Sequence, residues 1–236
     1  MPQKVTTIGF DADDTLWHNE VFFRVTQERF ASLLRDYAEP GDLETRLLAA
    51  EQRNIGHYGF GIKGFVLSMI ETAIEITDAR VPAATIRELI DAGQEMLRHP
   101  IDLLPHARAA VESTARTHRV ILITKGDLLD QERKLAQSGL GDLFDAVEIV
   151  SAKTATVYAG IFARHGNGAD RALMVGNSMK SDVLPPIEAG GWGVFVPQGP
   201  AWALEHAEPP ARDDHAARFH QLDDLAALPA LIDAIG

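Results

Sequence analysis

The chain has 236 residues, of which 46% are apolar, and it carries a formal net charge of −12. A chain of this length can form one large domain, or a core domain with a smaller insertion, around a substantial buried core. The negative charge argues against nucleic acid or an anionic membrane as a partner, because both attract basic surfaces. The absence of cysteine excludes disulfides, thiolate metal sites and cysteine nucleophiles. No apolar run has membrane-spanning length and no signal-peptide pattern opens the chain, so we expect a cytoplasmic protein.

The first element is a short apolar run at residues 5–10, which predicts a buried strand. Directly after it comes Asp11-Ala12-Asp13-Asp14-Thr15. Apolar residues then recur at helical spacing up to about residue 37, and further helices are predicted at about 42–53, 63–77 and 83–98. No strand pattern interrupts this stretch, so residues 18–98 read as an all-helical insertion after the first strand.

From about residue 105, strands and helices alternate. Strands are predicted at 120–124, 146–150, 172–175, 193–196 and, at an edge, 219–222. The predicted helices lie at about 105–117, 127–138, 154–165, from about 181, and at 223–235, and residues 199–215 read as a loop. This alternation is typical of a parallel sheet covered by helices on both faces.

The predicted fold is therefore α/β, with a three-layer Rossmann-like parallel sheet core and an inserted α-helical cap domain. The core takes residues 1–16 and 100–236, and the cap takes residues 17–99. An insertion at this point of the chain is expected to lie over Asp11.

The predicted insertion contains a glycine-rich pattern at residues 59–64. Gly59-Phe60-Gly61-Ile62-Lys63-Gly64 matches G-x-G-x-x-G, but a dinucleotide fingerprint must follow a strand, and this one follows a predicted helix. Two readings stay open: a turn between helices, or a substrate-facing loop that uses His57, Tyr58, Phe60 or Lys63.

Polar side chains follow the core strands at the points where those strands end. They are Asp11, Asp13, Thr124, Lys153, Asn177, Ser178 and Asp182. Parallel strands end at one edge of a sheet, which is where open α/β folds bind ligands. Carboxylates, a hydroxyl and an ammonium at one edge form the kind of set that phosphoryl transfer needs.

With these residues in place, the sequence resembles the haloacid dehalogenase superfamily of hydrolases, of the phosphatase type with a helical C1 cap. The resemblance rests on four motifs in order: Asp11-Ala12-Asp13-Asp14-Thr15, Thr124, Lys153, and Gly176 to Asp182. Many relatives have Asp where this chain has Asn177, and Pro where it has Thr154.

The resemblance implies a Mg²⁺-dependent phosphatase that acts on a small phosphorylated metabolite. Asp11 would attack phosphorus, and Asp13 would protonate the leaving alcohol and then deprotonate water. Thr124, Lys125 and Lys153 would bind the phosphoryl group, and Lys153 would also offset the charge of Asp11. The implied Mg²⁺ ligands are Asp11, the backbone carbonyl of Asp13, Asp182 and Asn177.

Three alternatives stay open. A phosphomutase shares all four motifs and returns the phosphoryl group to a sugar. A 2-haloacid dehalogenase has no leaving alcohol to protonate, and the relatives of that kind lack the second aspartate, so Asp13 argues against it. A non-catalytic binding or regulatory protein could keep the same fold. The sequence indicates neither the physiological substrate nor the oligomeric state.

Overall fold

The computed structural model describes residues 4–199, 202–211 and 215–236. Its centre is a six-stranded parallel sheet in the order β3-β2-β1-β4-β5-β6. The strands are β1 (Thr7–Phe10), β2 (Arg119–Lys125), β3 (Ala146–Val150), β4 (Ala172–Gly176), β5 (Trp192–Phe195) and β6 (Phe219–Gln221). All six predicted strands are present, and the prediction of a three-layer α/β core is confirmed.

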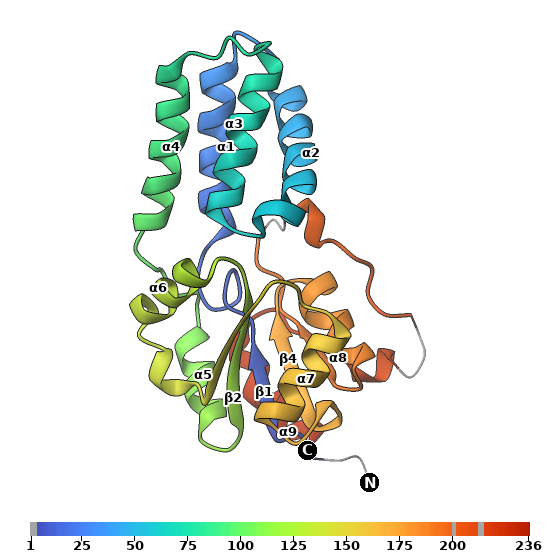
Figure 1. Cartoon of the computed structure of the whole chain (residues 1–236). Coiled ribbons are helices and arrows are strands. Elements are labelled where there is room, and N and C mark those ends of the chain that lie inside the picture. The colour runs from blue at the N-terminus through green and yellow to red at the C-terminus, as the bar shows by residue number, and fades with distance from the viewer. Residues whose placement is uncertain (1–3, 200–201, 212–214) are drawn as a thin grey trace. The chain divides into compact units, whose positions relative to one another are not determined.

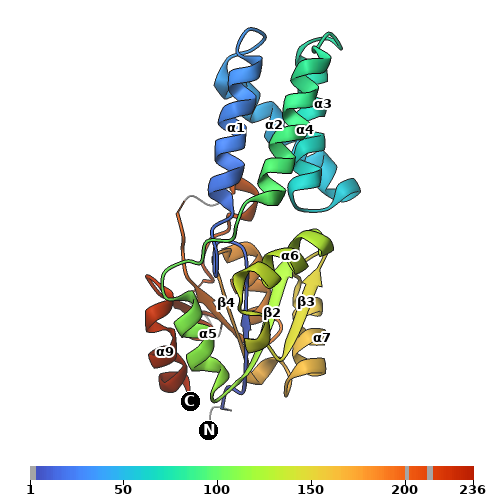
Figure 2. The ribbon, with the colours of Figure 1, turned by 90° about the vertical axis from the view of Figure 1, so that its left-hand side faces the viewer.

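The central strands alternate their side chains between two apolar layers, because successive residues of a strand point to opposite faces. Ile8, Leu122 and Val175 belong to the cluster on one face, together with residues of α5 (Ala107–Ala115) and α9 (Leu228–Ile235). Ile123 and Met174 belong to the cluster on the other face, with residues of α7 (Ala155–His165). Figure 2 shows α5 and α9 on one side of the strands and α7 on the other.

The strand order reverses beside β1, which pairs with β2 on one side and with β4 on the other. Such a reversal is a topological switch point, where open α/β sheets bind ligands beyond the carboxyl ends of their strands. The chain leaves β1 at this point, and the backbone N–H of Asp11 donates to the carbonyl of Val175 at 2.9 Å. The sheet therefore fixes the start of the first motif against the end of β4.

The remaining core helices differ from the prediction in detail. The helix α6 (Leu128–Ser138) lies where it was expected. The helix expected from residue 181 is a π-helical turn, Met179–Val183, followed by the short α8 (Leu184–Glu188), which carries Pro185 and Pro186 in its first turn. The loop predicted at 199–215 contains a short 3₁₀ turn, Ala203–Glu205, and its residues 200–201 and 212–214 lie outside the described residues.

The insertion is helical, as the sequence predicts. It contains α1 (Glu20–Leu34), α2 (Pro40–Tyr58), α3 (Ile62–Ile76) and α4 (Ala83–Arg98), which lie side by side in Figure 1. Residues from all four helices form a separate apolar cluster that includes Phe30, Leu47, Phe65 and Leu89. No helix in the described part of the chain is both long and apolar enough to cross a membrane.

The chain divides into two compact units. One comprises Met1–Glu20, Ile101–Lys125 and Gln131–Gly236, and the other comprises Val21–Pro100 with Gly126–Asp130. The boundary after the first motif lies later than the expected residue 16, because Trp17 is fully buried in the sheet unit. Residues 126–130, expected in the core, fall in the helical unit, where Asp127 forms an ion pair with Lys63 at 2.9 Å.

Candidate active site

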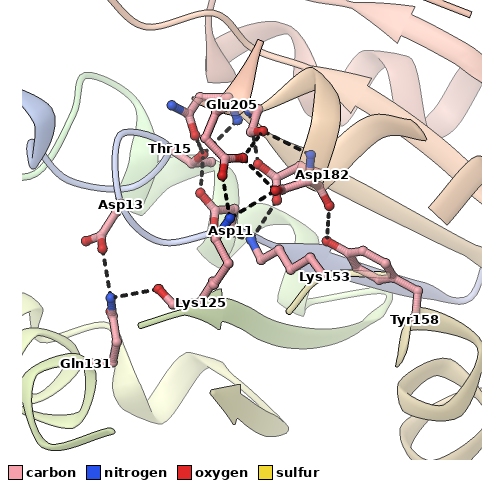
Figure 3. A network of polar contacts seen from close by, with 12 residues as sticks. Asp11, Asp13, Thr15, Lys125, Gln131, Lys153, Tyr158, Asp182 and Glu205 are labelled. Atoms are coloured by element: carbon pink, nitrogen blue, oxygen red, sulfur yellow. Dashed lines mark hydrogen bonds and ion pairs between the residues drawn. The ribbon is translucent and has the colours of Figure 1, made fainter. Parts of the chain in front are cut away.

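Three charged side chains meet beyond the carboxyl ends of β1, β3 and β4. The ammonium of Lys153, on the segment that follows β3, forms ion pairs with Asp11 and with Asp182, the latter at 2.6 Å. All three side chains are buried, and Figure 3 shows Lys153 between the two carboxylates. One ammonium thus faces two carboxylates, and the cluster carries a net charge of −1 when all three groups are ionised.

The electrostatics of Asp11 follow from this arrangement. Burial and the negative charge of Asp182 raise the pKa of Asp11 to about 7, although Lys153 acts in the opposite direction. For Lys153, burial alone would lower the pKa, but the two carboxylates raise it above its ordinary value. The lysine therefore stays charged while Asp11 lies in a site with unbalanced negative charge.

Backbone geometry at the end of β4 holds Asp182 in place. Its Oδ2 accepts the backbone N–H of Ser178 at 3.0 Å, which leaves Oδ1 for Lys153. The side chain passes so close to Gly176 that a Cβ there would lie 2.4 Å from the Asp182 carboxylate. Tyr158 of α7 donates its hydroxyl to the carbonyl of Ser181 at 3.0 Å and so fixes the turn from a second element.

Asp13 lies in different surroundings from Asp11. It accepts from Trp17 Nε1 at 2.7 Å, from Gln131 Nε2 at 2.7 Å and from Lys134 Nζ at 2.9 Å. Although burial acts to raise it, the pKa of Asp13 is lowered by Lys134 and by these hydrogen bonds. In Figure 3 its carboxylate points toward Gln131, away from the group around Asp11 and Lys153.

The other residues of the first motif shape the loop. The Thr15 hydroxyl donates to Asp11 Oδ2 at 3.1 Å and accepts the backbone N–H of Asn177 at 3.1 Å, so it links the loops after β1 and β4. Asp14 accepts the backbone N–H groups of Asn19 and Glu20 at 2.9 Å each. Asp14 therefore caps the backbone that enters α1.

The two residues at the end of β2 lie in unequal settings. Thr124 is buried within the strand end. Lys125, the last residue of β2, forms an ion pair with Glu205 at 2.5 Å and donates to Ser181 Oγ at 3.1 Å. Burial acts to raise the pKa of Glu205, but Lys125 and the hydroxyls of Ser178 and Ser181 lower it below its ordinary value.

The structure therefore brings most of the predicted site residues together, but in two groups. Asp11, Lys153, Asp182 and, through Thr15, Asn177 form one group. Asp13 forms the other group with partners from α6. Thr154, at the position where many relatives have Pro, caps α7 by accepting the backbone N–H of Val157.

Sequence reasoning missed four residues: Gln131 and Lys134, which contact Asp13, and Tyr158 and Glu205, which contact Ser181 and Lys125 beside the first group. Gln131 and Lys134 are three residues apart on a predicted helix, which places them on one face. That spacing is a signal, although it does not say which carboxylate the two residues contact. No sequence pattern singles out Glu205, which lies in a segment that reads as a loop.

The carboxylates of this site are candidate ligands for Mg²⁺. No three His, Asp or Glu side chains converge on a metal-binding point in the part of the chain that the structure describes. Mg²⁺ is commonly held by one or two carboxylates together with waters and substrate phosphate. Asp11 and Asp182 are two buried carboxylates that share one ammonium, and burial together with the charge of Asp182 raises the pKa of Asp11. These two carboxylates fit Mg²⁺, and the Asn177 amide and the Asp13 backbone carbonyl remain the further ligands that the resemblance implies.

Comparison with known proteins gives a consistent family. A model described as haloacid dehalogenase-like hydrolase matches residues 5–190. A haloacid dehalogenase-like family hydrolase from Xanthomonas campestris is 40% identical and has a TM-score of 0.86, with 99% of this chain and 92% of that chain covered. No curated protein matches the chain.

More distant solved structures share the fold. HAD-hydrolase YfnB from Bacillus subtilis, solved with bound magnesium, is 14% identical, with a TM-score of 0.65 over 98% of this chain and 100% of that chain. The L-2-haloacid dehalogenase from Xanthobacter autotrophicus is 17% identical, with a TM-score of 0.63 over 98% of this chain and 100% of that chain. On the family model and the 40% identical relative, this chain belongs to the haloacid dehalogenase-like hydrolases.

Proposed function

We propose that the protein is a Mg²⁺-dependent phosphatase that hydrolyses a small phosphomonoester through an aspartyl-phosphate. One observation carries this proposal: two carboxylates two residues apart occupy separate environments. Asp11 lies beside Lys153 and Asp182, where a phosphoryl group and a cation can be held, whereas Asp13 is held apart by Trp17 and α6. For this division Asp11 must be ionised, which a cation bound beside it would favour, and Asp13, whose pKa is lowered here, must take up a proton before it can act as the acid.

The chemistry then divides between the two aspartates. Asp11 attacks phosphorus, the bond from phosphorus to the ester oxygen breaks, and the leaving alcohol takes a proton from Asp13. Water next attacks the aspartyl-phosphate and gives its proton to Asp13, which restores Asp11 and releases phosphate. Lys153 and Thr124 bind phosphoryl oxygens. Mg²⁺, when bound, would neutralise the negative charge that develops on those oxygens in the transition state.

Asp13 also favours phosphate esters over haloacids. The family includes the haloacid dehalogenase from Xanthobacter autotrophicus, so membership alone does not choose the reaction. A halide leaves as a stable anion and needs no proton, whereas an alkoxide must be protonated as it leaves. A second carboxylate at residue 13 has a task in the first step of ester hydrolysis and none in halide displacement. The magnesium in YfnB is a further point in favour of metal-dependent chemistry.

The test is a phosphate-release screen over many phosphomonoesters, with Mg²⁺ and with EDTA, alongside halide release from 2-chloropropionate. We expect phosphate release that EDTA abolishes, and no halide release. Asp11→Asn should remove turnover, while Asp142→Asn, the same exchange at an exposed residue of a short turn, should keep it. Halide release without phosphate release, or full turnover by Asp11→Asn, would contradict the proposal. Phosphorus NMR of the products separates hydrolysis from transfer to a second position on a sugar.

A further inference from the structure

A second group of polar side chains lies beside the site and surrounds a carboxylate that belongs to the chain itself. Glu205 accepts from Lys125 Nζ at 2.5 Å, from Ser178 Oγ at 2.6 Å and from Ser181 Oγ at 2.5 Å. Lys125, Ser178 and Ser181 are called the oxyanion cradle below. The cradle offers one ammonium and two hydroxyls to one carboxylate, which is a donor set typical of carboxylate and phosphate binding.

The cradle is held in shape by contacts that do not involve Glu205. The Ser178 hydroxyl accepts the backbone N–H of Ser181 at 3.0 Å, and Lys125 Nζ lies 3.1 Å from Ser181 Oγ. Tyr158 fixes the carbonyl of Ser181 from α7. These donors would therefore keep their positions if the carboxylate of Glu205 left, so the cradle is preorganised for an oxyanion.

The segment that delivers Glu205 is partly exposed. Ala203, His206 and Glu208 are exposed. Lys180 donates a hydrogen bond of 2.8 Å to the carbonyl of Leu204, and Ala207 packs on a small apolar cluster. The Glu205 side chain is itself 17% exposed. A dissolved anion can compete with a group held in this way.

The cradle adjoins the residues proposed for phosphoryl transfer. Ser181 precedes Asp182 in the chain, and Lys125 follows Thr124. Figure 3 shows Glu205 and Asp182 close together on this side of the network. An anionic group bound in the cradle would therefore lie next to the reacting centre.

We propose that Lys125, Ser178 and Ser181 form an oxyanion-binding site that Glu205 fills as an internal stand-in, and that this site takes a carboxylate or phosphate group of a ligand. The ligand group is either a second anionic group of the substrate or a free anion. The substrate form of the inference rests on the proposed phosphatase function, whereas anion binding by the cradle does not.

The first arm of the test measures binding of inorganic phosphate by calorimetry, at fixed ionic strength and in EDTA so that metal-dependent binding does not contribute. Glu205→Ala empties the cradle and leaves Lys125 in place. While Glu205 fills the cradle, phosphate can bind only to the molecules in which the cradle is empty. If about one molecule in ten is empty, removal of Glu205 should lower the apparent Kd for phosphate about tenfold. The double variant Glu205→Ala with Lys125→Met should lose this gain.

Glu208→Ala is the matched control, because it removes the same charge from the same segment at an exposed position outside the cradle. It should leave phosphate affinity unchanged. Glu205→Gln, which keeps the size of the side chain, provides a second reading if Glu205→Ala lowers the melting temperature strongly. Unchanged or weaker phosphate binding in both Glu205 variants would overturn the proposal and leave Glu205 as a structural tie.

The second arm compares esters that differ by one carboxylate, with Mg²⁺ present: phosphoglycolate against ethyl phosphate, and 3-phosphoglycerate against glycerol 3-phosphate. If the cradle binds a substrate group, Glu205→Ala lowers KM for the carboxylated member of each pair and leaves the other member unchanged. Equal effects on both members, with the gain of the first arm intact, identify a free anion as the ligand. Absence of any phosphate release would contradict the phosphatase function and leave the first arm valid.

Discussion

At the scale of single residues, the site depends on how three buried charges are balanced. Lys153 is shared by Asp11 and Asp182, so neither carboxylate has a cation of its own. Removing a charged group from water is costly unless it is paired, and here the pairing is incomplete. The raised pKa of Asp11, about 7, expresses this cost.

Asp11→Asn should therefore preserve the fold while it removes turnover. The neutral amide no longer repels Asp182, and Lys153 keeps its ion pair with Asp182. We expect the variant to melt at the same temperature as the parent protein or higher, in EDTA and near neutral pH. Thermal unfolding followed by circular dichroism measures this. A melting temperature several degrees lower would show that the charge of Asp11 stabilises the folded state.

Lys134→Met tests how Asp13 is held. The substitution leaves the carboxylate of Asp13 with Trp17 and Gln131 but without its cation. An uncompensated buried charge of this kind should lower the free energy of unfolding by about 1–3 kcal/mol. We also expect kcat to fall more than KM changes, because the displaced group moves protons rather than binding substrate.

The control for this variant is Lys63→Met, which breaks an ion pair whose two side chains are 54% and 28% exposed. Exposed pairs contribute little, so its cost should stay within about 0.5 kcal/mol. Denaturant unfolding of both variants, read with steady-state kinetics on the best ester, makes the comparison. Equal losses in the two variants would refute a special role for Lys134.

At the scale of elements, the end of β4 decides where Asp182 lies. The strand ends at Gly176, the π-helical turn Met179–Val183 follows, and the carboxylate folds back against the backbone at Gly176. Ser178 caps this turn by accepting the N–H of Ser181. Residue 176 must therefore be glycine, because any side chain there would occupy the space of the Asp182 carboxylate.

Gly176→Ala should displace Asp182 and lower Mg²⁺-dependent turnover at least about tenfold, the factor that corresponds to 1.4 kcal/mol. The matched exchange Gly160→Ala lies in α7, where a new Cβ meets nothing within 4 Å. Alanine is the better helix former by about 1 kcal/mol, so Gly160→Ala should stabilise the protein and keep its activity. Activity of Gly176→Ala equal to that of the parent would show that Asp182 tolerates displacement.

At the scale of the whole molecule, the chain forms two compact units, each with its own apolar cluster. The proposed cation site lies within one of them, on Asp11 after β1 and Asp182 after β4. These residues are far apart in sequence, so ligands that join them are expected to stabilise the folded sheet unit against unfolding.

Mg²⁺ should therefore raise the melting temperature, because a ligand that binds only the folded state stabilises it by about 2.7 kcal/mol at a concentration of 100 times Kd. EDTA should reverse the shift, and Asp182→Asn should remove most of it. Differential scanning fluorimetry over a Mg²⁺ titration measures the effect, with Na⁺ at equal ionic strength as the reference. An equal shift in Asp182→Asn would place the cation elsewhere.

The periodic parts of the fold could be predicted from the sequence. The strand over residues 146–150 and the helix over 83–98 lie at the predicted bounds, because alternation and helical spacing are local signals. The last helix begins at Leu228 rather than 223, and the segment near 181 forms a π-helical turn. A 3₁₀ turn, Leu225–Ala227, precedes the last helix, and prolines stand in the first turn of that helix and of α8, where a backbone N–H is missing.

The sequence by itself determined the family, the order of the strands and helices, and the candidates Asp11, Lys153 and Asp182, because parallel strands must end at one edge of the sheet. Only the tertiary structure separated Asp13 from that group, joined it to Gln131 and Lys134, and brought Glu205 to Lys125. The physical reason is that the end of a strand fixes the backbone position of a residue. The residue that its side chain contacts depends on how loops and helices distant in sequence pack around that strand end.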